Sequence, residues 1–114
     1  MIRRALWVVL AALLLGGCSI KKMATKSMAD ALTGGQDVFG TDNDPELVRE
    51  ALPFGLKTLE SLLSELPEHR GLLLSACKGF TQYGFAFVQG EAAYVEARDY
   101  TRAQEMRERA LHLY

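Results

Sequence analysis

The chain has 114 residues, with 13 basic and 14 acidic side chains and a formal net charge of −1. This length allows one small domain, and the lack of a basic block or arginine-rich face gives a nucleic-acid partner no electrostatic support. The two histidines, His69 and His112, lie outside any nucleophile or metal-ligand pattern. We therefore expect a protein that is not an enzyme, with no catalytic residue, no metal and no cofactor.

The N-terminus has the pattern of an export signal. Two arginines at positions 3 and 4 precede an apolar run over residues 5–15. As a helix this run would be about 16 Å long, roughly half of a ~30 Å hydrocarbon core, which suits a signal peptide better than a membrane span. Residues 15–18, Leu-Gly-Gly-Cys, match the bacterial lipobox. We predict a lipoprotein signal peptide over residues 1–17 and lipidation of Cys18; the alternative is an ordinary secretory signal in which Cys18 is incidental.

The residues around Cys18 also predict where the protein resides. Ser19 follows it, whereas an aspartate there would favour inner-membrane retention, so we expect an outer-membrane lipoprotein that faces the periplasm. Residues 1–17 hold two basic and no acidic side chains, so their removal leaves a net charge of −3. With Cys18 acylated, Cys77 has no partner within the chain, and its apolar surroundings favour a buried, inert side chain over a reactive thiol.

Residues 18–43 are predicted to form a lipid-anchored tether with a short helix over residues 27–32, SMADAL, which Gly34 and Gly35 would end. Lys21, Lys22 and Lys26 lie close to the predicted lipid. They would either contact anionic headgroups or be solvated.

A strong helix start follows at residues 44–46, where Asp44 suits the N-cap, Pro45 the first helical position and Glu46 the first turn. Apolar residues then recur at helical spacing as far as Leu66. An interior proline costs about 3 kcal/mol, so Pro53 predicts a kink or a brief break. The acidic residues at 42, 44 and 46 resemble the start of a calcium loop, but the glycine and glutamate that such a loop needs at its sixth and twelfth positions are missing.

The segment from Glu68 to Ala97 is ambiguous. Aromatic residues at 83, 85 and 87 alternate as in a strand, yet Leu73, Cys77 and residues 80, 83 and 87 recur at helical spacing. No second strand pattern exists to pair with, so we predict a helix. Three aromatic side chains on it are candidates either for ordinary core packing, which is favoured, or for lining an apolar ligand site or channel: Phe80, Tyr83 and Phe87.

A last helix is predicted from an Asp99 cap to the C-terminus, with Tyr100, Ala103, Ala110 and Leu113 on one face. This apolar stripe reaches Tyr114 without a capping residue. We therefore expect an all-α domain over residues 44–114, built of antiparallel helical hairpins and apparently truncated.

Several long segments of this sequence resemble those of one protein family. They are ADALTGG, DNDPELVREALPFGLKTLESLLSELPEHRGLLLSA, GFTQYGFAFVQGEA and ARDYTRAQEMRERALHLY, of which LPFGLKTLESLL and GFTQYGFAFVQ are the most specific. In this order they resemble the T-component of tripartite ATP-independent periplasmic (TRAP) transporters, the TatT-like periplasmic lipoproteins.

The resemblance implies tetratricopeptide-like helical hairpins and an accessory role in a TRAP transporter. It further implies docking of the periplasmic substrate-binding protein, assembly as a homo-oligomer and passage of an apolar ligand. Family members are roughly twice this length, which also favours a truncated scaffold here. The alternative function is that of a structural outer-membrane lipoprotein in envelope assembly.

Overall fold

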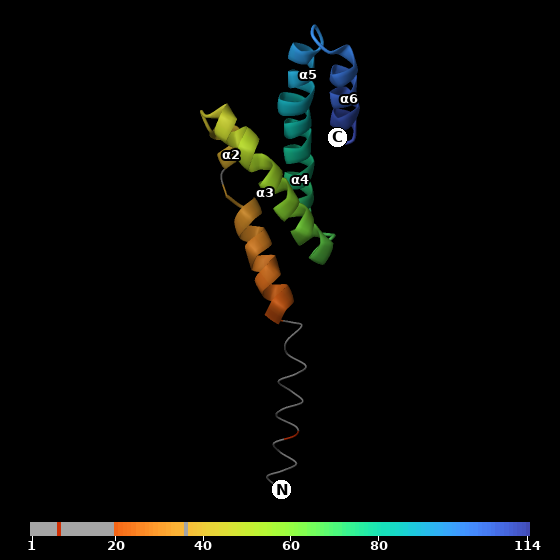
Figure 1. The fold of residues 1–114 in the computed structure, drawn as a ribbon. Coiled ribbons are helices and arrows are strands. Elements are labelled where there is room, and N and C mark those ends of the chain that lie inside the picture. The colour runs from red at the N-terminus through yellow and green to blue at the C-terminus, as the bar shows by residue number, and fades with distance from the viewer. Residues whose placement is uncertain (1–6, 8–19, 36) are drawn as a thin grey trace.

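The computed structural model describes Trp7, residues 20–35 and residues 37–114. Cys18 and all of the predicted signal peptide except Trp7 lie outside these residues, so the lipidation of Cys18 stays a prediction. Residues 20–33 form a helix, followed by α2 (Val38–Thr41), α3 (Pro45–Glu65), α4 (Arg70–Tyr83), η1 (Gly84–Gln89), α5 (Gly90–Val95) and α6 (Tyr100–Leu111). The described residues contain no strand, which confirms the predicted all-α fold (Figure 1). None of their helices is long and apolar enough to cross a membrane.

Helix α3 begins where the sequence predicts. The Asp44 carboxylate accepts hydrogen bonds from the backbone N–H groups of Glu46 and Leu47, each at 3.1 Å, and so satisfies two of the free donors at the helix start. Of the kink or brief break predicted at Pro53, the break does not occur, because α3 runs unbroken from Pro45 to Glu65. Leu52 and Leu56 on either side of the proline are buried, and their packing holds the helix together where one backbone hydrogen bond is missing.

The ambiguous segment is helical, as predicted, but not uniformly so. Elements α4, η1 and α5 follow one another without a gap from Arg70 to Val95, and the middle six residues are a π-helix. There the Gly90 N–H donates to the Phe85 carbonyl, an i to i−5 bond in place of the usual i−4 bond. From the start of η1 onward the buried residues, Gly84, Val88 and Ala92, recur every four positions.

Two apolar clusters lie along the antiparallel hairpin of α3 and α4. One cluster joins the helix 20–33 to the C-terminal half of α3 and the start of α4, through Ala29, Leu62 and Leu72. The other joins the N-terminal half of α3 to the end of α4 and to η1, and is centred on Val48, Leu52 and Leu56. The close approach of α3 and α4 depends on Gly79, because a Cβ there would lie 2.6 Å from Leu56 Cδ2.

Helix α6 forms a second antiparallel hairpin with η1 and α5, on a different side of the long helix from α3 (Figure 1). Asp99 caps it, as predicted, by accepting the Arg102 N–H at 2.9 Å. Ala103 and Ala110 are buried against the long helix, and a Cβ on Gly84 would lie 3.3 Å from Leu113 Cβ. The continuous helix from Arg70 to Val95 therefore forms one hairpin with α3 and a second hairpin with α6.

Two further expectations, on the burial of Cys77 and on the length of the first helix, differ from the structure. Cys77 is exposed, not buried, because the core face of α4 consists of Leu72, Ala76 and Gly79 and lies one residue earlier than the predicted stripe. The helix expected over residues 27–32 is also longer, since it runs from residue 20 to residue 33.

Candidate functional site

An apolar hollow of about 230 Å³ opens where α2, α3 and η1 meet. We call it the aromatic hollow. Buried Val48 and Leu52 of α3 lie at its base. Its other lining residues come from α2 and from the junction of α4 and η1: Phe39, Gly40, Gln82, Phe85, Ala86 and Phe87. The hollow thus joins three segments that are far apart in the sequence.

The Phe39 wall is positioned by a polar anchor at Asp37. Its carboxylate accepts the Gly40 N–H at 2.9 Å, which caps the four-residue helix α2, and it also pairs with Lys78 of α4. The hydrogen bond from Lys78, followed by that from Gly40, lowers the pKa of Asp37 below its ordinary value. With α2 fixed in this way, the Phe39 ring lies 3.5 Å from the position that a Cβ on Gly55 would occupy.

The opposite wall depends on the π-helix. Phe85, Ala86 and Phe87 are consecutive residues of η1, and all three line the hollow. Phe85 is 65% exposed, a large value for an aromatic side chain in the middle of a packed helix. Single π-helical turns occur frequently at functional sites, because they redirect side chains that a regular α-helix would place elsewhere.

The three aromatic residues predicted as candidates are placed together, and each is partly buried against the core. Phe80, Tyr83 and Phe87 pack against the cluster of Val48, Leu52 and Leu56, and the rings of Tyr83 and Phe87 are 5.9 Å apart. Phe87 is the member of the three that also lines the hollow. Their role as ligand or channel lining stays a prediction.

Sequence reasoning missed the two exposed aromatic walls, Phe39 and Phe85. Phe85 carried a signal, since it belongs to the strand-like alternation at residues 83, 85 and 87 that a regular helix does not explain. Phe39 carried none, because it lies in a segment with the composition of a tether.

His69 has a structural role at the start of α4. The Leu72 N–H donates to His69 Nδ1 at 3.2 Å, and His69 Nε2 lies 2.9 Å from Asp30 Oδ1. Hydrogen bonds to Lys26 and then to His69 lower the pKa of Asp30. Nδ1 thus caps α4, and Nε2 joins α4 to the helix 20–33. Within residues 20–35 and 37–114, no three His, Cys, Asp or Glu side chains cluster in a way that could hold a metal.

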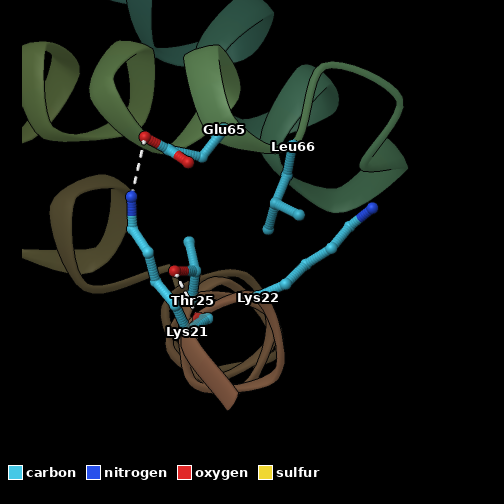
Figure 2. Close-up of a pocket in the computed structure, with 5 residues that line it drawn as sticks. All are labelled: Lys21, Lys22, Thr25, Glu65 and Leu66. Atoms are coloured by element: carbon cyan, nitrogen blue, oxygen red, sulfur yellow. Dashed lines mark hydrogen bonds and ion pairs between the residues drawn. The ribbon is translucent and has the colours of Figure 1, made fainter. Parts of the chain in front are cut away.

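A second hollow, of about 300 Å³, lies between the helix 20–33 and the C-terminal end of α3 (Figure 2). Four of its five lining residues are polar or charged: Lys21, Lys22, Thr25 and Glu65, with Leu66 as the fifth. Lys21 Nζ lies 3.4 Å from Glu65 Oε1, whereas Lys22 points away from that carboxylate. This hollow is the gap beside a helix-to-body contact, and we assign it no ligand.

Comparison with known proteins gives a consistent family assignment. A family model described as "TRAP transporter T-component" matches residues 41–114, which include α3 to α6 and the aromatic hollow's α3 and η1 walls. An uncharacterized protein of Treponema pallidum (strain Nichols) is 34% identical over 116 residues, a match that covers 90% of this chain. The chain spans only 36% of the length of that relative. No solved structure matches. The chain therefore belongs to the TRAP transporter T-component family.

Proposed function

We propose that this protein is an accessory component of a TRAP transporter that docks the periplasmic substrate-binding protein at the aromatic hollow. The proposal includes attachment to the outer membrane through lipid on Cys18, facing the periplasm. Membership of the T-component family supports the transport role. The single observation that carries the docking role is the exposed pair of walls, Phe39 and Phe85, over a buried apolar base.

The physics of protein interfaces favours this site. A few aromatic or other large anchors that fill pockets supply most of the binding free energy of an interface. Phe85 is held by a helix backbone, and Phe39 is held by the Asp37 anchor, so neither wall needs to be ordered on binding. A partner that covers both rings would gain apolar burial at a small entropic cost.

The size of the hollow favours docking over enclosure of a small ligand. Pockets for drug-sized ligands have volumes of about 300–1,000 Å³, and the aromatic hollow has about 230 Å³ and is open to solvent. It suits one or two side chains of a partner protein. Passage of an apolar ligand would need walls from a further copy of the chain, and so depends on the proposed homo-oligomer.

The test is direct binding between the purified full chain and the substrate-binding protein encoded with its transporter, measured by calorimetry. Replacement of Phe85 by serine should weaken binding by about tenfold or more, as expected for an aromatic anchor. Phe39→Ser should act in the same direction. Both side chains are exposed, so the variants should keep the helical circular dichroism of the parent.

Leu74→Ser is the matched control, because Leu74 of α4 is 72% exposed and does not line the hollow. It should bind as the parent does. Equal binding by all four proteins would reject the hollow as the docking site. If the folded parent does not bind at all, a structural role in the cell envelope becomes the better proposal.

A further inference from the structure

The helix over residues 20–33 presents an apolar face to solvent. Four large side chains on it are more than half exposed: Ile20, Met23, Met28 and Leu32. At 100° per residue, Ile20, Met23 and Met28 lie with Ala24 and Ala31 on one side of the helix. Exposed apolar side chains grouped on one face mark an interaction surface, whereas scattered ones do not.

The opposite side of the same helix is fixed to the body of the protein. Ala29 is fully buried against Leu62 and Leu72, and a Cβ on Gly71 would lie 2.6 Å from Thr33 Oγ1. The contact between His69 and Asp30 adds a polar link on this side. The helix is therefore held in one orientation, with its apolar face directed away from α3 and α4.

Charge is divided unequally between this helix and the rest of the protein. Residues 20–33 carry Lys21, Lys22, Lys26 and one acidic residue, Asp30, which gives a net charge of +2. Residues 37–114 carry eight basic and 13 acidic side chains, a net charge of −5. An anionic surface would attract the helix and repel the body.

The helix begins close to Cys18, the proposed site of lipid attachment. Ile20 is two residues after Cys18, and two extended residues span about 7 Å. Residues 5–15, just upstream, are the apolar run. With lipid on Cys18, which is part of the proposed function, the start of the helix cannot move far from the bilayer.

We propose that the helix 20–33 lies flat on the membrane, with Ile20, Met23 and Met28 in the interfacial region and its net positive charge close to anionic lipid headgroups. An amphipathic helix binds a bilayer by the sum of apolar burial and attraction of basic residues to anionic lipids, and this helix supplies both. It would act as a rigid base that sets the orientation of the acidic body above the surface. The proposal is independent of the aromatic hollow and its partner.

The test uses Trp fluorescence, because the chain contains a single tryptophan, Trp7. In a Trp7→Phe background, Met28→Trp places a reporter on the apolar face. The full chain is reconstituted in vesicles of phosphatidylcholine and phosphatidylglycerol, with and without doxyl-labelled phosphatidylcholine. We expect blue-shifted emission and about twofold quenching by the doxyl lipid, as for a side chain at the acyl boundary. Vesicles of phosphatidylcholine alone, which carry no anionic lipid, should reduce both signals.

Tyr94→Trp in the same background is the control, because Tyr94 is 84% exposed and belongs to α5, which lies at the far end of the molecule from this helix (Figure 1). It should show neither signal. Red-shifted, unquenched emission from the Met28→Trp protein would overturn the proposal. So would a blue shift that occurs without vesicles and grows with protein concentration, because a second copy of the chain would then cover the face.

Discussion

The two hairpins of this protein are joined in different ways. Helix α3 meets α4 through large side chains, with Leu52, Leu56 and Leu72 at the centre of its clusters. Helix α6 meets η1 and α5 through small ones, chiefly Ala103 and Ala110. Polar contacts supplement these small apolar side chains: Arg107 pairs with Glu96, and the Tyr114 hydroxyl donates to Gln89.

This difference predicts a gradient of stability along the long helix. Complete burial of a leucine side chain contributes about 1.5–3 kcal/mol, and each buried methylene about 0.8 kcal/mol, so an alanine contributes far less than a leucine. Exposed ion pairs add little. The α3–α4 hairpin should therefore hold the fold together, while α6 opens locally at a lower free energy.

The largest effect should come from Leu72→Ala. Leu72 is fully buried where the helix 20–33, α3 and α4 meet, so its truncation leaves a cavity in the first hairpin. We expect the free energy of unfolding to fall by about 2–5 kcal/mol in urea denaturation. Leu74→Ala, on the exposed side of the same helix, should change it by less than about 0.5 kcal/mol. Similar losses in both variants would contradict the assigned core face.

A smaller and local effect is expected from Ala110→Leu. Ala110 is buried close to Gly84, and the added carbons have no space unless α6 moves outward. Overpacking of this kind costs about 1–3 kcal/mol. Hydrogen exchange should show loss of protection in α6, with α3 amides unchanged. Ala93→Leu at an exposed site of α5 is the control, and equal loss of protection in α3 and α6 would show that the two hairpins are not separable.

The contrast between large and small side chains at the helix contacts also explains how much of the fold could be predicted from the sequence. Asp44 and Asp99 predicted their helices correctly because a cap acts on backbone groups within three residues, so its chemistry is local. The phase of α4 was wrong by one residue because its core face uses Ala76 and Gly79, whose weak hydrophobicity hides them beside Leu73 and Cys77. Close packing of small residues depends on the partner helix, which a single sequence does not display.

The aromatic hollow was harder still to predict. It depends on the pairing of Asp37 with Lys78, residues 41 positions apart, and on the π-helical turn at Phe85. Neither leaves a local pattern before the fold is known. Phe87, by contrast, was predicted because it shares the helical stripe of the core.

The smallest effect should be the pH dependence of the link between α5 and α6. Arg107 donates two hydrogen bonds to the Glu96 carboxylate, at 2.6 and 3.1 Å, and these lower the pKa of Glu96 below its ordinary value of 4.5. A carboxyl whose pKa is lower in the folded state stabilises that state fully above its ordinary pKa, and the effect is lost as the pH falls through the folded pKa. Opening of α6, measured by hydrogen exchange corrected for intrinsic rates, should therefore increase below about pH 4.5. Glu96→Gln should remove most of this increase. Glu105→Gln is the control and should not, because Glu105 pairs with Arg102 inside α6 and does not link α5 to α6. An unchanged pH dependence in Glu96→Gln would mean that another titrating group, and not Glu96, makes the opening of α6 depend on pH.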